Sequence, residues 1–465
     1  MSSPISDEKK SGMYFAHRTR FVVLFLGLVF ITFCNSNYNT ITFSVICMDD
    51  VVEEQSIGTN ETHWLESSSK VSAVFSAGAI GAIVGLIPSV PLTNLLGIRV
   101  VLSFYGIAAS LATLAIPLAV EIGYFAVMAM RFFQGFGASI LFSSIGSISE
   151  GWSPLAEIST YVAILSAGFQ ISNMILMPMA GILCESSWGW RAIYYIYGGS
   201  ATIFNVLFFF FFTDRASMHR NVSKKELQRI DEGRIEVSAS SVPYFEICKD
   251  KVILSIWLTA VGGNLSLMCL ILYGPTYLNK VLHLDVKETG FSNAIPYILA
   301  AAVKFISGPL SDALTFIPDL WRVIFFAAVS QGGVAIGYFV MALTSSRTVA
   351  QIAYTWSIVM LGVNIVGVVK CAQLRARHHV HFVMAVISFS AWIAVFLLPI
   401  VVGLMCPDHT PEQWSLFFIC VGIWVIIMNV PFPFFASIEP AHYTKPEFSR
   451  KVTPSDGDVE KSSIN

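Results

Sequence analysis

The stretch "DRASMHRNVSKKELQRIDEGRIEVSASSVPYFEICKD" occupies residues 214–250 and is a long polar interruption in a chain that is otherwise largely apolar. Apolar runs of about 20 residues, long enough to cross a bilayer as helices, recur on both sides of it. Six such runs precede the stretch and six follow it. An even division around one linker is typical of transporters built from two repeated halves. The sequence therefore predicts an all-α membrane protein with twelve transmembrane helices in two six-helix halves.

Composition supports a multispanning chain and excludes other classes. Only 12% of the 465 residues are charged, against about 25% in soluble domains. The net charge of −2 offers no basic face for nucleic acid, so the lipid bilayer and a small solute are the expected partners. The predicted domains are a cytoplasmic N-terminus (1–20), a first half (21–213), a cytoplasmic linker (214–250), a second half (251–440) and a cytoplasmic tail (441–465).

The distribution of Lys and Arg predicts the orientation. With the N-terminus inside, the linker alone carries eight of them over 214–251, whereas the external segments together carry five. Cytoplasmic loops are enriched in these residues, so both termini are expected to be cytoplasmic. The loop 47–70 is then external, and its Asn60-Glu61-Thr62 sequon is a predicted N-glycosylation site.

Two cations lie within predicted spans, and no acidic residue or histidine lies at mid-span. Arg131 is in span 4 and Lys304 in span 8, whereas Asp312 marks the end of span 8. Ionisable residues at membrane depth are costly and usually face a cavity or a partner. Arg131 therefore either faces a central cavity or pairs with carbonyl groups, and Lys304 either binds substrate or extends towards the membrane surface. Positive charge without a carboxylate favours an anionic solute.

Neutral polar residues at the same depth suggest further ligand contacts. Span 1 contains "FCNSNYNT" (33–40), which includes Tyr38 and Asn39, and span 7 contains Asn264. These residues either line the substrate pocket or form hydrogen bonds between helices, which average about 0.6 kcal/mol. Gln134 follows Arg131 by one turn and is a candidate to fix its orientation.

Several motifs resemble one branch of the major facilitator superfamily, the organic-anion and sodium/phosphate cotransporter branch that includes sialin and the vesicular glutamate transporters. They are "LYGPTYLNKVLHLDVKETGFSNAIPY" (272–297), "RFFQG" (131–135) and "FASIEPAHY" (435–443). The resemblance covers roughly residues 20–443. It implies the major facilitator fold, a small organic or inorganic anion as solute, and gating residues at Gly97, Arg99 and Asp312.

Departures from the family pattern affect gating and coupling. Asn94 replaces the aspartate of the loop between spans 2 and 3. Ala138 and Gly146 stand where proton-coupled relatives carry a glutamate and a histidine, and Tyr38 stands in place of a substrate-binding arginine. The resemblance therefore implies an anion carrier whose coupling chemistry is altered.

The function predicted from the sequence is secondary active or facilitative anion transport by alternating access. A transporter-like solute sensor or scaffold without translocation is the alternative. No enzyme constellation, metal site or organic cofactor is expected; Na⁺ and H⁺ are the candidate coupling ions. The plasma membrane and a lysosomal or vesicular membrane both remain candidate locations, and the sequence does not define an oligomeric state.

Overall fold

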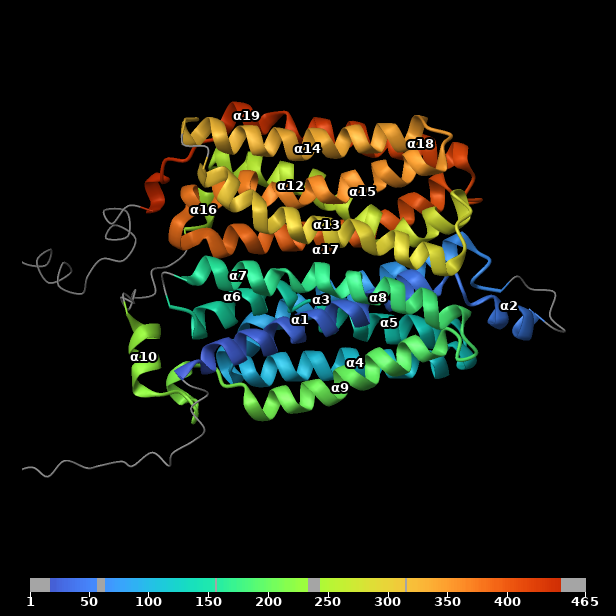
Figure 1. The fold of residues 1–465 in the computed structure, drawn as a ribbon, viewed down its shortest axis with the longest axis horizontal. Helices are drawn as coiled ribbons and strands as arrows, with labels where there is room; N and C mark the ends of the chain where they lie inside the picture. Colours follow the sequence, from blue (N-terminus) through green and yellow to red (C-terminus); the bar gives the residue numbers. More distant parts are fainter. Residues whose placement is uncertain (1–16, 57–62, 155–156, 233–242, 314–315, 445–465) are drawn as a thin grey trace, which may run out of the picture. The chain divides into compact units, whose positions relative to one another are not determined.

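The computed structural model describes residues 17–56, 63–154, 157–232, 243–313 and 316–444. Within these ranges every regular element is helical, and twelve helical segments are long and apolar enough to cross a membrane (Figure 1). A helix satisfies its backbone hydrogen bonds internally, which hydrocarbon requires. The all-α class and the number of twelve spans are therefore confirmed.

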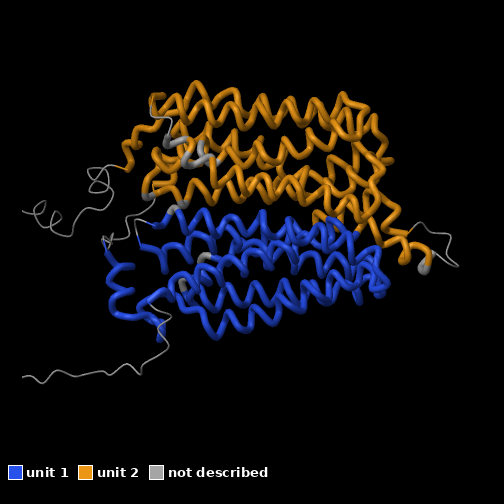
Figure 2. The backbone as a smooth tube through the Cα atoms, in the orientation of Figure 1, with its two compact units in different colours: residues 1–44, 77–235 blue, residues 45–76, 236–465 orange. Residues whose placement is uncertain are grey.

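Two compact units divide the chain. Residues 1–44 and 77–235 form unit 1, and residues 45–76 and 236–465 form unit 2 (Figure 2). The boundary at 235 falls inside the predicted linker. Residues 45–76, which the sequence places in the first half, group with unit 2. The following paragraphs describe each unit separately.

Unit 1 contains the first six membrane helices and the linker helix. Its longest helices in Figure 1 include α1, α4 and α9, which lie side by side. The helices are α1 (Thr19–Ser44), most of α3 (Ser68–Leu96), α4 (Ile98–Ile122), α5 (Tyr124–Ala138), α6 (Leu141–Trp152), α7 (Ile158–Ser166), α8 (Gly168–Glu185), α9 (Arg191–Phe211) and α10 (Lys224–Asp231).

Unit 2 contains the remaining six membrane helices and several short ones. Its helices are α2 (Asp49–Ser56), α11 (Tyr244–Lys249), α12 (Lys251–Thr276), α13 (Val286–Ala313), α14 (Asp319–Leu343), α15 (Arg347–Asn364), α16 (Lys370–Ala376), α17 (Val380–Met405), α18 (Pro411–Asn429) and α19 (Pro431–Phe435).

The linker forms a docked helix. The helix α10 begins at a Ser223 cap, whose hydroxyl accepts from Glu226 N at 3.2 Å. Ile230 and Glu226 are only 1% and 3% exposed. A serine cap typically contributes about 1 kcal/mol, and burial of Ile230 attaches the helix to unit 1.

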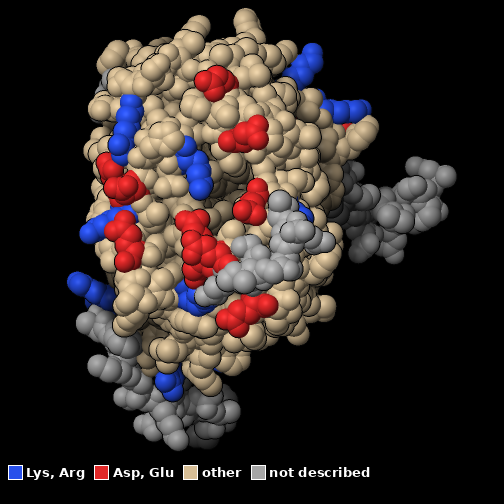
Figure 3. All heavy atoms as spheres, turned by 90° about the vertical axis from the view of Figure 1, so that its right-hand side faces the viewer, with Lys and Arg blue, Asp and Glu red and all other residues tan. Residues whose placement is uncertain are grey.

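The surface shown in Figure 3 carries both acidic and basic side chains, with uncharged surface between them. Large apolar side chains such as Phe125 and Leu343 are more than three-quarters exposed, as expected for helices that contact lipid.

Candidate functional site

Arg131, on α5, is the centre of a polar cluster inside unit 1. Its side chain is 0% exposed. Nη1 donates to Tyr38 O at 2.9 Å and to Gln134 Oε1 at 2.7 Å. The guanidinium lies over the Tyr38 ring, 4.8 Å from its centroid. The structure thus brings together three residues that the sequence had identified.

Gln134 is itself held by a second hydrogen bond. Its Nε2 donates to Thr113 Oγ1 at 2.9 Å, and the Thr113 hydroxyl donates to Ala109 O at 2.8 Å. Because Nε2 faces Thr113, the amide oxygen faces Arg131. This chain of contacts from α4 fixes the direction in which the guanidinium presents its other nitrogens.

The remaining edge of the Arg131 guanidinium makes no hydrogen bond within the described part of the chain. Its Nε and Nη2 are buried and have no hydrogen-bond partner there. These two nitrogens share one edge of the planar group, so their N–H bonds are parallel and match two oxygens of a carboxylate or phosphate. At Gly78 of α3, a Cβ atom would lie 3.0 Å from Nη2, so the glycine keeps a side chain away from this edge.

No carboxylate forms an ion pair with Arg131 among the described residues. A buried charge without an ion-pair partner costs several kcal/mol, and the hydrogen bonds from Nη1 and the Tyr38 ring offset part of that cost.

The polar run of α1 separates into different contacts. Asn35 Nδ2 donates to Ser172 Oγ at 3.1 Å, and Asn39 Nδ2 donates to Asn173 Oδ1 at 2.9 Å. Both partners lie on α8. Asn39 therefore forms a hydrogen bond between two helices, which is one of the two roles that the sequence predicts for it. Tyr38, by contrast, lies directly against Arg131.

Asn264 and Lys304 lie in unit 2. Asn264 Nδ2 donates to Ile387 O and to Ser390 Oγ, both at 3.0 Å and both on α17. Lys304 is partly buried on α13. Both residues belong to unit 2, whereas Arg131 belongs to unit 1.

Gly97 and Arg99 meet an acidic residue that the sequence analysis did not select. Gly97 has φ 81° at the start of α4, and Asp214 Oδ1 accepts from Arg99 N at 2.7 Å. The carboxylate thus lies at the helix N-terminus, where negative charge is favourable. The side chains of Asn94 and Asp312 and the whole of Asn60 lie outside the described residues.

In unit 1, polar contacts between segments that are distant in the sequence bind the linker helix α10 near the start of α1; we call this region, and its counterpart around Asp250 in unit 2, the linker end of the fold. Arg20, at the start of α1, pairs with Glu157 at 3.4 Å, and Arg229 of α10 pairs with Glu157 at 3.1 Å. Glu226 Oε1 accepts from Arg20 N at 2.8 Å. The linker helix α10, which follows the sixth membrane helix, therefore binds the start of the first membrane helix at Arg20. It also binds Glu157, which follows the fourth membrane helix.

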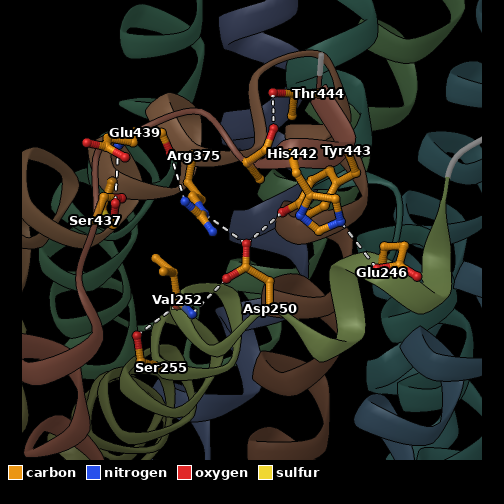
Figure 4. A network of polar contacts seen from close by, with 12 residues as sticks. Glu246, Asp250, Val252, Ser255, Arg375, Ser437, Glu439, His442, Tyr443 and Thr444 are labelled. Carbon is orange, nitrogen blue, oxygen red and sulfur yellow. Dashed lines mark hydrogen bonds and ion pairs between the residues drawn. The ribbon is translucent and has the colours of Figure 1, made fainter. Parts of the chain in front are cut away.

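Unit 2 repeats this arrangement with the charges exchanged. Asp250 caps α12 through Val252 N at 3.0 Å and accepts from Arg375 Nε at 2.8 Å and from Tyr443 OH at 3.2 Å (Figure 4). Arg375 also donates to Glu439 O at 3.0 Å. In unit 2, the segment that follows the last membrane helix therefore binds the start of that unit's first membrane helix, through Tyr443 and Asp250. It also binds the end of that unit's fourth membrane helix, through Glu439 and Arg375.

Among the described residues no cluster of three or more His, Cys, Asp or Glu side chains could hold a metal ion.

The sequence is similar to those of known membrane transporters. The Major Facilitator Superfamily model matches residues 24–399. Sialin of Ovis aries is 23% identical over 76% of this chain and 72% of its own length. Sodium-dependent phosphate transport protein 3 of Mus musculus is 27% identical over 57% of each chain. A Drosophila melanogaster relative is 25% identical over 70% of this chain, and that match spans 64% of the relative.

Solved structures agree on the fold. The inward-facing, unoccupied structure of a bacterial homolog of the human lysosomal transporter Spinster has a TM-score of 0.69 and covers 94% of this chain and 99% of its own. Its sequence identity is 14%, so the likeness concerns the fold alone.

Proposed function

Since the chain belongs to the major facilitator superfamily, we propose that it is an alternating-access carrier of small anions and that Arg131 is the anion anchor. In transporters with such repeats, helix bundles rock around a site near the middle of the membrane. The observation that carries the proposal is the buried edge of Arg131, whose Nε and Nη2 make no hydrogen bond in the described chain.

The chemistry of this edge favours an oxyanion. A guanidinium binds carboxylate or phosphate through two parallel hydrogen bonds, and such charge-assisted bonds are roughly twice as strong as neutral ones. The Tyr38 ring beneath the group adds a cation–π contact worth about 2 kcal/mol when desolvated. Together these contacts hold Arg131 in place while one edge stays available to solute.

The proposal includes Na⁺ or H⁺ as the coupling ion and cytoplasmic positions for both termini. No acidic residue lies at mid-span, which favours Na⁺ binding through neutral oxygens, or uniport, over a carboxylate proton carrier. The plasma membrane and a lysosomal or vesicular membrane are the two proposed locations. A uniported anion would respond to voltage by about 2.3 kcal/mol per charge per 100 mV.

The test is uptake of radiolabelled phosphate and organic carboxylates into proteoliposomes under imposed sodium, proton and voltage gradients. Arg131→Ala should abolish saturable uptake, and Arg131→Lys should restore part of it because lysine keeps the charge but lacks the planar fork. The matched control is Arg347→Ala, since Arg347 is an exposed arginine paired with Glu288.

Two outcomes would contradict the proposal. Uptake that is unchanged in Arg131→Ala would remove Arg131 as the anchor. Saturable anion binding without any flux under all gradients would identify a solute sensor or scaffold instead of a carrier.

A further inference from the structure

The short helix α11 leads into the first membrane helix of unit 2 and is held in one orientation by contacts on two sides. Ile247 is 0% exposed and belongs to a buried apolar cluster that includes Phe432 and Tyr443. Glu246 Oε2 lies 3.3 Å from His442 Nε2 (Figure 4). Because these contacts fix the rotation of α11 about its axis, they also determine which of its side chains face outward.

The outward face of α11 is aromatic and basic. Successive helical residues lie about 100° apart, so Phe245 and Lys249 each lie about 160° from Ile247. The Phe245 side chain is 68% exposed, and that of Tyr244 is 59% exposed. Lys249 Nζ lies 3.8 Å from the centroid of the Phe245 ring. Exposed aromatic rings beside a lysine are typical of the interface between membrane and water, where the rings contact lipid and the ammonium group reaches the head groups.

This face continues into an exposed apolar surface of α12. The centroid of the Tyr244 ring lies 5.0 Å from that of Phe382 on α17, and the Phe382 ring lies 6.2 Å from that of Trp257 on α12. Leu254 and Leu258 share the Trp257 face of α12, since residues three and four apart are neighbours on a helix. Their side chains are 41% and 40% exposed. Exposed leucines of a membrane helix contact acyl chains, so the outward face of α11 adjoins a surface that contacts lipid.

Two lysines give the same region a positive charge. Lys249 and Lys251 are exposed on either side of Asp250. The Asp250 carboxylate is bound by Arg375 and Tyr443 instead. Neither lysine forms an ion pair within the described part of the chain. Both ammonium groups are therefore available to an anionic partner.

We propose that α11 is an interfacial anchor of unit 2 that binds anionic phospholipid. The rings of Tyr244 and Phe245 contact the upper part of the acyl chains, and the ammonium groups of Lys249 and Lys251 bind the head group. The partner is a lipid of the bilayer, because the lysines lie beside aromatic rings that adjoin the lipid-facing surface of α12. With the linker in the cytoplasm, as proposed above, this lipid belongs to the cytoplasmic leaflet, which is rich in anionic lipids.

The experiment measures which lipid contacts α11. Cys248 is an exposed free thiol on this helix, so a thiol-reactive fluorophore attached to it in the full-length carrier reports contact with brominated lipids, which quench it. Labelled Cys248→Ser gives the signal from other cysteines, which is subtracted. The bilayers contain phosphatidylcholine and phosphatidylserine, and one of the two is brominated in each sample. Wild type should select phosphatidylserine by roughly five- to thirtyfold, because each lysine near a membrane surface contributes about fivefold in affinity for anionic lipid.

Two variants and a matched control separate charge from aromatic contact. Lys249→Gln/Lys251→Gln should bring the selectivity close to one, while quenching by phosphatidylcholine persists because the rings remain. Phe245→Ser should weaken quenching by both lipids. The control is Lys224→Gln/Lys225→Gln, which also removes two exposed lysines from the linker but lies in unit 1. Its selectivity should equal that of wild type.

Three outcomes would overturn the proposal. The first is equal quenching by the two brominated lipids in wild type, or unchanged selectivity in Lys249→Gln/Lys251→Gln. The second is no quenching by either lipid, which would place α11 in water. The third is reversal of the quenching by soluble glycerophosphoserine, since the lysines would then bind a head group without a bilayer. The readout does not involve uptake, so each of these results leaves the test of Arg131 unaffected.

Discussion

Replacing Gln134 by glutamate would place a carboxylate against the Arg131 guanidinium without changing the shape of the side chain. Gln134 Oε1 already lies 2.7 Å from Arg131 Nη1, so the new charge needs no movement to form an ion pair. The variant would carry its own anion beside the proposed anchor. It should therefore bind external anions less tightly than wild type does.

The magnitude follows from the distance. With the two charge centres about 4 Å apart and an effective dielectric constant of about 20, the pair interacts by about 4 kcal/mol. Each 1.4 kcal/mol is a tenfold change in affinity, so roughly a thousandfold loss is the upper limit. We expect the half-saturation concentration for uptake to rise between roughly tenfold and a thousandfold, because the guanidinium keeps its second edge.

The assay is concentration-dependent anion uptake into proteoliposomes, with a thermal unfolding curve to verify that the variant folds. The control is Thr113→Val, which removes the acceptor of Gln134 Nε2 without adding charge. It should weaken uptake by tenfold at most, since one neutral hydrogen bond contributes about 1 kcal/mol. A folded Gln134→Glu carrier with the half-saturation concentration of wild type would refute the assignment of Arg131.

Three further predictions concern the linker end of the fold. Asp250→Asn should destabilise unit 2 by about 3 kcal/mol, because it leaves a partly buried arginine without its partner; thermal unfolding should show this as a lower midpoint. Gly97→Ala should cost at least 1–2 kcal/mol by the same measurement, since φ is 81° and a Cβ would clash with the Asp214 carboxylate. The control Gly146→Ala lies inside α6 and its Cβ would meet nothing within 4 Å, so it should be neutral or stabilise by up to about 1 kcal/mol. Burial lowers the pKa of His219 in the folded protein, so the contribution of its neutral form to stability is fully present above the unfolded pKa of about 6.5 and is lost as the pH falls below it. The thermal unfolding midpoints at pH 7.5 and pH 5.5 should therefore differ more in wild type than in His219→Gln. Equal differences in the two proteins would contradict this.

The sequence predicted those features that depend only on residues close together in the chain. Apolar runs of sufficient length gave the twelve spans, because hydrocarbon admits little else. A lone arginine among apolar residues identified Arg131, and the helical repeat placed Gln134 one turn beyond it. Each of these inferences needs only neighbouring residues.

Contacts between distant segments could not be predicted in the same way. Asp214 meets Arg99 across 115 residues of chain, and Glu226 meets Arg20 across 206. Tyr38 and Asn39 are adjacent, yet one lies against Arg131 and the other binds α8, because successive helical residues point about 100° apart. The sequence states the polarity of each residue but not which helix lies opposite it.

The repeated contact at the linker end has a consequence for how the chain can be divided. In each unit, the residues that follow the sixth membrane helix return to the start of the first: Glu226 to Arg20, and Tyr443 to Asp250. Each set of polar contacts thus joins residues on one side of the linker segment 233–242. Two separately synthesised fragments, cut within that segment, would each retain its own set, Glu226 with Arg20 in one and Tyr443 with Asp250 in the other, although residues 45–76 of unit 2 would remain on the first fragment.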